Sequence, residues 1–158
     1  MNNKKKVLVT GGSGGIGSAI CDIFKNNNFE LILTSSNDQN LDILKEKYGD
    51  RNHYYKLDLL NKEDIIETIK NISQDHKDIS VIINNAGITN DGLLLRMKNK
   101  QWDDVISANL YSSFYILRGL LPNMIANKYG KVVGISSVIA TTGNPGQSNY
   151  AASKSGLI

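Results

Sequence analysis

The most constraining feature of this sequence is a glycine-rich turn, TGGSGGIG at positions 10–17, between an apolar run and a helical pattern. Val7 to Val9 precede the turn, and apolar residues recur at helical spacing from Ile16 to Phe24. Glycines let the backbone bend sharply and approach a ligand closely, while the free N–H groups and the dipole of a helix start favour an anion. A flexible loop without a ligand is the alternative, but the flanking strand and helix favour a phosphate site.

Two registers fit these glycines. GxGxxG at 12–17 matches the general fingerprint of dinucleotide binding, and TGxxxGIG at 10–17 matches a narrower variant with three residues inside the turn. The expected ligand is therefore a dinucleotide whose pyrophosphate lies at the turn.

Length and composition are those of a globular protein, so residues 1–158 are expected to form a single domain. The hydrophobic share is 41% and the charged share is 21%, both ordinary values. A net charge of +3 is too small to predict nucleic-acid binding, and no apolar run has the length of a signal peptide or a membrane span. We therefore expect a cytoplasmic protein with neither membrane nor nucleic acid as a partner.

Strand and helix patterns alternate after the glycine-rich turn. Further apolar runs lie at 31–33, 54–57, 81–83 and 132–135. Helices are expected at about 41–47, 62–76 and 101–128. Because the apolar runs are continuous rather than alternating, they predict parallel strands that are covered on both faces. The expected fold class is α/β, a doubly wound parallel sheet of Rossmann type with about five strands.

The helical patterns also predict which residues face the core. One shared face contains Ile65, Ile66, Ile69 and Ile72, and another contains Leu110, Phe114, Leu117, Leu121 and Ile125. Asn61 lies three residues before Asp64 and is expected to cap its helix. Pro122 should kink the long helix or break it.

Four other side chains are given structural rather than chemical roles. Cys21 is the only cysteine, so it cannot form an internal disulfide, and we expect a buried thiol. His53 and His76 have no partners at metal-ligand spacing, so no metal site is expected. Trp102 begins the long helix and is expected in the core.

Tyr150 and Lys154 form a candidate catalytic pair. They are four residues apart on an expected helix, so they project from the same face. A tyrosine titrates near pH ~10, and lowering its pKa to about 7 requires roughly 4 kcal/mol in favour of the phenolate. One cation at about 4 Å in an effective dielectric near ~20 supplies a similar amount. The same spacing is also common on helix surfaces, so the pair needs further support.

Taken together, the motifs resemble the short-chain dehydrogenase/reductase family over essentially the whole chain. They occur in the family's order, as TGxxxGIG, NNAG at 84–87, Asn109, Ser137, Tyr150 and Lys154. Within the family, NNAGITNDGLLLRMK at 84–98 and GNPGQSNYAASKSGLI at 143–158 are most similar to reductases of 3-oxoacyl chains on acyl carrier protein, in fatty-acid biosynthesis. The resemblance implies an NADP-dependent oxidoreductase.

The resemblance implies roles for four catalytic residues. Tyr150 would protonate the substrate carbonyl oxygen while hydride leaves the reduced nicotinamide. Lys154 would lower the pKa of Tyr150 and bind the nicotinamide ribose, and Ser137 would bind the carbonyl oxygen. Asn109 would anchor a water of the proton relay. Taken singly, Ser137 could cap its own loop and Asn109 could simply face between helices.

The resemblance also implies the residues that hold the cofactor. Asp58, at the end of the third strand, would contact the adenine, and the segment 85–87 would line the adenosine side. The implied set is Gly11, Ser13, Gly15, Ile16, Gly17, Thr34, Asp58, Asn85, Ala86, Gly87, Tyr150 and Lys154.

NADPH is expected in preference to NADH. The acid that binds the ribose of NAD should follow the second strand, but Thr34, Ser35 and Ser36 occupy that region. No carboxylate there repels a 2′-phosphate, and hydroxyls can donate to one. One departure weakens the expectation, because Gly14 stands where many NADP-using relatives have an arginine.

The expected partners are an acyl carrier protein and further copies of the chain. Arg96, Lys128 and Lys131 would attract an acidic carrier, with a scattered solvated surface as the alternative. The helix at 101–128 has more apolar residues than one sheet face needs, and relatives dimerise through this helix. We therefore expect a dimer or tetramer.

Two other function classes remain open, an enzyme of the same fold acting on a sugar, steroid or small alcohol, and a nucleotide-binding fragment without turnover. Only four residues follow Lys154, so the chain is expected to lack the C-terminal strands of the complete fold and to leave the fifth strand as an exposed edge. Little or no turnover is expected, because the helix of Tyr150 is short and the substrate side lacks a wall.

Overall fold

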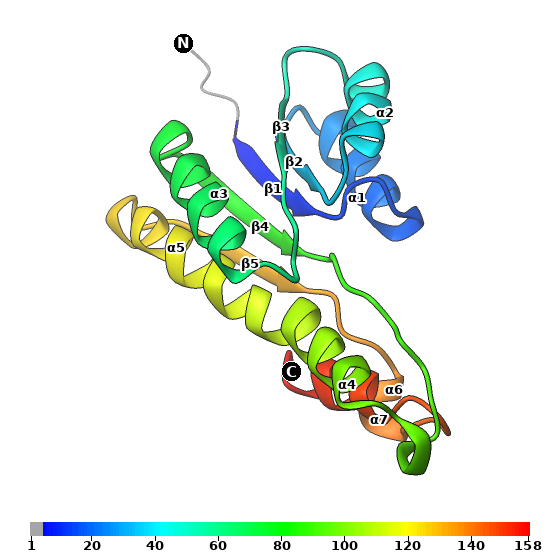
Figure 1. The fold of residues 1–158 in the computed structure, drawn as a ribbon. Helices are drawn as coiled ribbons and strands as arrows, with labels where there is room; N and C mark the ends of the chain where they lie inside the picture. The colour runs from blue at the N-terminus through cyan, green and yellow to red at the C-terminus, as the bar shows by residue number, and fades with distance from the viewer. Residues whose placement is uncertain (1–4) are drawn as a thin grey trace.

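The computed structural model describes residues 5–158, which contain one sheet of five strands (Figure 1). The strands are β1 (Lys6–Thr10), β2 (Glu30–Ser35), β3 (His53–Lys56), β4 (Ile79–Asn84) and β5 (Lys131–Gly134). They pair in parallel in the order β3-β2-β1-β4-β5. This arrangement confirms the expected α/β class, with strand boundaries within two residues of those expected.

Helices lie on both faces of the sheet (Figure 1). They are α1 (Gly15–Asn26), α2 (Asp38–Tyr48), α3 (Lys62–Asp75), α4 (Asn99–Ile106), α5 (Ser112–Ala126), α6 (Ile139–Thr142) and α7 (Ser148–Ser155). A 3₁₀ turn, η1 (Leu94–Arg96), precedes α4, and a π-helical turn, η2 (Ser107–Tyr111), joins α4 to α5. None of the helices within residues 5–158 is long and apolar enough to cross a membrane.

The central strands β1, β2 and β4 are buried from both sides, as their continuous apolar runs predict. Val9 and Leu33 pack in one cluster with residues of α1 and α2. Leu8, Ile32 and Ile82 pack in a second cluster with residues of α3 and α5. Successive residues of a strand thus enter different clusters, which places the core on both sides of the central strands.

Asparagine side chains begin two of these helices. The Asn61 Oδ1 accepts the Asp64 N–H at 3.1 Å, which confirms the expected cap of α3. The Asn37 Oδ1 accepts the Asn40 N–H at 2.9 Å and caps α2 in the same way. Both caps satisfy a backbone donor that has no partner inside its own helix.

The long helix expected at 101–128 is not one regular helix. It consists of α4, the π-turn η2 and α5, so its irregularity lies at 107–111. The break considered at Pro122 is absent, because α5 continues past this residue to Ala126. The short helix α6 was not expected from the sequence.

The core face expected for the long helix was correct only in part, because Leu117 and Leu121 pack against the core but two other residues do not. Phe114 and Ile125 are 56% and 73% exposed, whereas Ile116, Leu120 and Met124 are buried. The hydropathy pattern did not identify the buried face of α5, because that face begins with two polar residues, both serines.

The hydroxyls of these two serines, Ser112 and Ser113, form hydrogen bonds within the helix. They donate to the carbonyl oxygens of Ala108 and Asn109, one turn earlier, so polar residues can lie in the core at this point.

Two smaller expectations were also wrong, and one was confirmed. Ile66 is 49% exposed although its neighbours on the expected face are buried, and Trp102 is 37% exposed rather than in the core. Cys21 is fully buried, as expected, and burial raises the pKa of its thiol to about 12.

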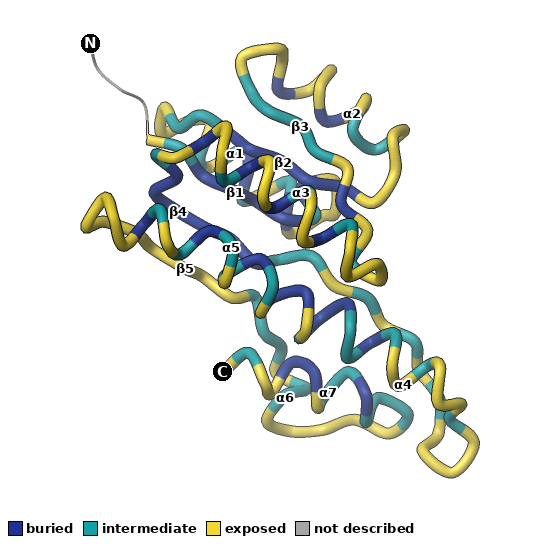
Figure 2. The backbone as a smooth tube through the Cα atoms, turned by 60° about the vertical axis from the view of Figure 1, so that its left-hand side comes forward, coloured by how far each residue is buried: buried dark blue, intermediate teal, exposed yellow. Residues whose placement is uncertain are grey.

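Strand β5 is exposed along its whole length (Figure 2). Val132 and Val133 are 44% and 43% exposed, although both are apolar. Within residues 5–158, β5 pairs only with β4, so it forms the open edge that the sequence led us to expect.

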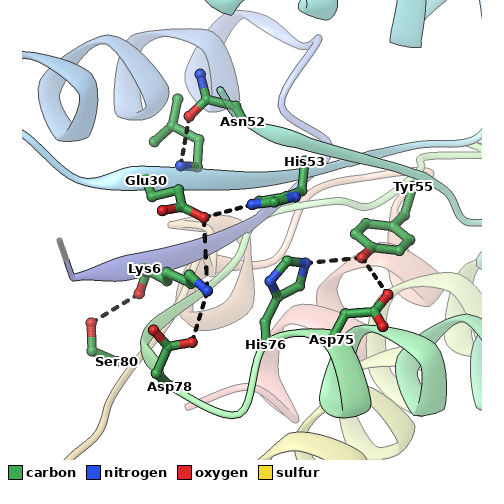
Figure 3. Close-up of polar contacts among 10 residues, drawn as sticks. Lys6, Glu30, Asn52, His53, Tyr55, Asp75, His76, Asp78 and Ser80 are labelled. Atoms are coloured by element: carbon green, nitrogen blue, oxygen red, sulfur yellow. Dashed lines mark hydrogen bonds and ion pairs between the residues drawn. The ribbon is translucent and has the colours of Figure 1, made fainter. Parts of the chain in front are cut away.

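Charged and aromatic side chains close the end of the sheet where the strands begin (Figure 3). The Lys6 Nζ lies 2.9 Å from an Asp78 oxygen, and the His53 Nε2 lies 2.6 Å from the Glu30 Oε1.

His76 lies beside these pairs and is buried. Its Nε2 contacts the Tyr55 hydroxyl at 2.9 Å, and that hydroxyl also donates to Asp75 at 3.0 Å. Burial and this hydrogen bond raise the pKa of Tyr55 to about 12. We call Lys6, Glu30, His53, Tyr55, Asp75, His76 and Asp78 the basal cluster.

Candidate nucleotide-binding and catalytic site

A cavity of ≈ 440 Å³ lies at the carboxyl ends of the central strands, where ligands bind in open α/β sheets. Its walls come from the glycine-rich turn and from the segments that follow β2, β3 and β4. The lining residues are Gly11, Ser13, Gly14, Thr34, Ser35, Ser36, Asn40, Leu57, Asp58, Leu59, Leu60, Asn85, Ala86, Gly87, Ile88 and Ala108.

Two positions of the glycine-rich turn require glycine, Gly11 and Gly17. Gly11 has a φ of +66°, a left-handed conformation that favours glycine. A Cβ on Gly17 would lie 2.2 Å from the Gly11 carbonyl oxygen, so no side chain fits there. The Gly11 and Gly12 N–H groups donate to the Thr34 carbonyl at 3.1 and 3.3 Å, which ties the turn to β2.

Thr10 and Asn85 hold the turn against the end of β4. The Thr10 Oγ1 accepts the N–H groups of Asn85 and Ala86, each at 3.0 Å. In return, the Asn85 Nδ2 donates to the carbonyls of Thr10 at 2.9 Å and Gly11 at 3.2 Å. Sequence reasoning gave Thr10 no role of its own, although the motif TGxxxGIG begins with it.

The cavity includes part of the implied cofactor set. Gly11, Ser13, Thr34, Asp58 and the segment 85–87 line it. Gly15, Ile16 and Gly17 lie in the first turn of α1 and do not line it, and Ile16 is 62% exposed. Lining residues that sequence reasoning missed are Asn40, Leu57, Leu59, Leu60, Ile88 and Ala108.

Within residues 5–158, Asp58 is the only charged residue in the cavity wall. Its Oδ1 accepts the Leu60 N–H at 2.9 Å, and its own N–H donates to Asp64 at 2.8 Å. The carboxylate is therefore fixed in a turn after β3, at the mouth of the cavity.

Asn109 lies in the π-turn, a kind of irregularity that is frequent at functional sites. Its Oδ1 accepts the Ile88 N–H at 2.7 Å, and its Nδ2 donates to the Ile88 carbonyl at 3.0 Å and to the Ser153 Oγ at 2.9 Å. The buried amide thus fastens the loop after β4 to α7.

Lys154 and Tyr150 project from α7. The Lys154 side chain is buried, and its Nζ donates to the Ile135 carbonyl at 2.8 Å and lies 5.8 Å from the centre of the Tyr150 ring. Burial lowers the pKa of Lys154. No described residue hydrogen-bonds the Tyr150 hydroxyl, so it is available to a ligand.

Ser137 follows β5 and faces the start of α6. Its Oγ accepts the Ile139 N–H at 3.2 Å, which is the loop-capping arrangement considered from the sequence. The hydroxyl proton can still be donated to another group. Neither Ser137 nor Tyr150 lines the cavity, whose wall is formed by the adenosine side of the implied site.

The residues present fit a dinucleotide. The turn offers a backbone surface without side chains next to the start of α1, which suits a pyrophosphate. The cavity continues from there past Asp58 and the ends of β2 and β3, which gives room for an adenosine.

Comparison with known proteins gives a consistent family. A model of the short chain dehydrogenase family matches residues 5–158. A solved short-chain dehydrogenase from Streptomyces avermitilis superposes with a TM-score of 0.91 at 30% identity, over 99% of this chain and 57% of that one.

Several curated relatives carry the same name. The 3-oxoacyl-[acyl-carrier-protein] reductase FabG of Haemophilus influenzae is 36% identical over 154 residues, which is 98% of this chain and 64% of that protein. The protein of that name from Buchnera aphidicola subsp. Schizaphis graminum is 43% identical over 156 residues, again 98% and 64%. Nodulation protein G of Rhizobium sp. is 38% identical over 154 residues, 98% and 63%. The chain thus spans less than two thirds of the length of these relatives.

Proposed function

This chain belongs to the short chain dehydrogenase family, and from that premise we propose that it binds NADPH for the reduction of a 3-oxoacyl group on acyl carrier protein. The product would be the 3-hydroxyacyl form, made in the cytoplasm during fatty-acid biosynthesis. The observation that carries the proposal is that the Lys154 Nζ lies 3.5 Å from where a Cβ on Gly87 would be, and Gly87 lines the cavity. Tyr150 lies one turn before Lys154 on the same helix, α7. The names of the curated relatives support the substrate class.

In this proposal the bound nicotinamide supplies the hydride, and the chain supplies proton transfer and positioning. Tyr150 donates its hydroxyl proton to the substrate oxygen, and Ser137 donates a hydrogen bond to the same oxygen. One Lys154 N–H is held by the Ile135 carbonyl, which leaves two donors for the Tyr150 oxygen and the nicotinamide ribose. Asn109 keeps the loop after β4 against α7 and anchors a water of the relay.

We propose that the carrier protein contacts fewer of the basic residues than the sequence suggested. Arg96 lies just before α4, whereas Lys128 and Lys131 follow α5, so the two groups are at opposite ends of the α4–α5 rod (Figure 1). At 1.5 Å per residue the rod is about 40 Å long. One carrier domain cannot use both groups at one site, and we assign the carrier contact to the Arg96 end, beside α7.

We also propose self-association through α5. The exposed Phe114 and Ile125 lie on the side of α5 away from its buried residues, and a two-fold interface would cover them. Sedimentation tests this, because Phe114→Ser should raise the monomer fraction at micromolar concentration. A purely monomeric native chain would contradict the proposal.

Cofactor binding tests the first half of the proposed reaction. Titration of the chain with NADPH and with NADH, followed by cofactor fluorescence, should show tighter binding of NADPH. Tighter NADH binding would exclude the proposed cofactor.

Turnover tests the second half. NADPH oxidation with a 3-oxoacyl carrier substrate should be slow in this chain and faster in a chain as long as the relatives, and Tyr150→Phe should abolish it in both. The other candidate is a family member acting on a sugar, steroid or small alcohol, since membership of the family does not fix the substrate. Faster oxidation with one of those substrates would favour that candidate.

A further inference from the structure

We propose that Lys56 is the cation that binds the 2′-phosphate of the cofactor and that Asp38 competes with this phosphate for it. This inference rests on the proposed binding of NADPH. It assigns a cofactor contact to a residue outside the motifs and outside the cavity wall.

The adenosine end of the cavity lacks a positive charge of its own. Ser13, Ser35, Ser36 and Asn40 line it with neutral groups, and the only charged residue in the wall is the acid Asp58. Hydroxyl and amide donors can orient a phosphate, but charge-assisted hydrogen bonds from a cation are about twice as strong. A cation that reaches this end from nearby would therefore strengthen the preference for the 2′-phosphate beyond what the hydroxyls supply.

Lys56 is placed to be that cation. It ends β3, where it pairs with Ser35 at the end of β2. Neighbouring strands lie about 4.8 Å apart, and paired residues project from the same face of a sheet. The Ser35 Oγ lies 3.4 Å from the Ser13 Oγ of the glycine-rich turn, so this face leads directly to the cavity. An extended lysine side chain spans more than the gap between the two strands.

Asp38 holds Lys56 at the start of α2. The Lys56 Nζ lies 2.6 Å from the Asp38 Oδ2, and the hydrogen bond to this carboxylate raises the pKa of Lys56. Asn40, in the same first turn of α2, lines the cavity. Both members of the pair are more than half exposed, so the ammonium can turn from the carboxylate toward an incoming phosphate without leaving water.

The two members of this pair therefore have opposite effects on a 2′-phosphate. Lys56→Gln removes the cation and leaves the Asp38 carboxylate to repel the phosphate. Asp38→Asn keeps the cation and removes its competitor. Lys45 provides a matched control, because it lies near the other end of α2 and pairs with Asp50 at 3.5 Å, far from the cavity wall.

The test uses two ligands that differ only in the 2′-phosphate, adenosine 2′,5′-bisphosphate and adenosine 5′-monophosphate. Their affinities are measured by calorimetry at low salt, with no turnover involved. Lys56→Gln should weaken the bisphosphate about tenfold and leave the monophosphate unchanged, since hydrogen bonds to charged groups are of that strength. Lys56→Arg and Lys45→Gln should bind both ligands as the native chain does, and Asp38→Asn should bind the bisphosphate about threefold more tightly.

Three results would overturn the proposal. If Lys56→Gln lowers the affinity for both ligands equally, or for neither, Lys56 does not contact the 2′-phosphate. Loss of bisphosphate affinity in Asp38→Asn would show that the ion pair acts by ordering the start of α2. If the native chain does not prefer the bisphosphate, the proposed NADPH preference fails together with this inference, whereas a native preference that Lys56→Gln leaves intact refutes the inference alone.

Discussion

The two ends of the sheet are built from different chemistry. At the end where the strands begin, the basal cluster joins polar side chains to one another, as in the ion pair of Lys6 with Asp78 and the hydrogen bond between His53 and Glu30. At the end where they finish, neutral side chains bind backbone groups, as Thr10 and Asn85 do around the glycine-rich turn. In the first arrangement the side chains use their polar groups on one another. In the second the side chains hold the backbone in place beside a cavity.

This difference indicates where a ligand can be accommodated. A charged pair already uses its strongest interactions, so a further ligand must compete with them. A backbone turn held by neutral groups keeps free N–H donors, and positions 10–17 contain no charged residue, which suits an anion. Changes at the cavity end should therefore alter ligand binding, and changes in the basal cluster should alter stability alone.

The largest effect is expected at the cavity end, from Gly17→Val. The new Cβ would lie 2.2 Å from the Gly11 carbonyl oxygen, and a backbone atom cannot move aside cheaply. Overpacking of this kind costs about 3 kcal/mol, and displacement of the turn should weaken NADPH binding about a hundredfold. Cofactor fluorescence and urea unfolding measure the two effects.

Gly15→Ala is the matched control for this prediction. A Cβ on Gly15 has no atom within 4 Å, and alanine favours a helix by about 1 kcal/mol over glycine. This variant should be as stable as the native chain or slightly more so. If it is destabilised in urea as Gly17→Val is, the clash at Gly11 is not the cause.

The next effect concerns pH and the opposite end of the sheet. Burial, with His53 and Lys6 nearby, lowers the pKa of His76 from 6.5 to about 4. Its Nδ1 is buried without a hydrogen-bond partner, so the folded chain keeps the ring neutral while the unfolded chain protonates it at higher pH. The stability due to the neutral ring is present above about pH 6.5 and is lost as the pH falls toward about 4.

Urea unfolding at about pH 7 and about pH 4.5 measures this loss. The native chain should lose about 2 kcal/mol more than His76→Gln does, because the variant has no ring to protonate. The carboxylates titrate in both proteins, so their effects on the free energy of unfolding cancel in the difference. Identical pH profiles for the two proteins would show that His76 does not limit stability in acid.

The smallest effect is expected from Asp78→Asn, which removes the partner 2.9 Å from the Lys6 Nζ. The Asp78 side chain is 40% exposed, so the pair should contribute only about 0.5 kcal/mol, and less at high salt. The affinity for NADPH at about pH 7 should not change. A weaker cofactor affinity would break the contrast between the two ends, since it would couple them across the sheet.

The parts of the fold that follow from local chemistry could be predicted from the sequence. Continuous apolar runs identified the buried strands because both faces are covered, and Asn61 marked a helix start because its side chain satisfies an exposed donor. The residues of the cavity wall were harder to predict from the sequence. Asn40, Leu60 and Ala108 come from three separate segments, and only the packing of those segments brings them together.

Expectations failed where polar groups are satisfied internally. The buried face of α5 contains Ser112 and Ser113, whose hydroxyls bond to the preceding turn, so hydropathy selected the exposed Phe114 instead. The basal cluster was missed for a related reason. His53 and His76 are far apart in sequence, and only the folded chain brings their ring centroids within 4.2 Å of each other.

Gly87 is the point at which three segments of the site meet. A Cβ there would lie 2.8 Å from the Asn109 Oδ1 and 3.5 Å from the Lys154 Nζ, and Gly87 also lines the cavity. A methyl group there must displace the Asn109 amide, whose hydrogen bonds join the loop after β4 to α7. The shape of the cavity wall and the position of α7 are therefore linked through Gly87 and Asn109, so a substitution at this position should change both.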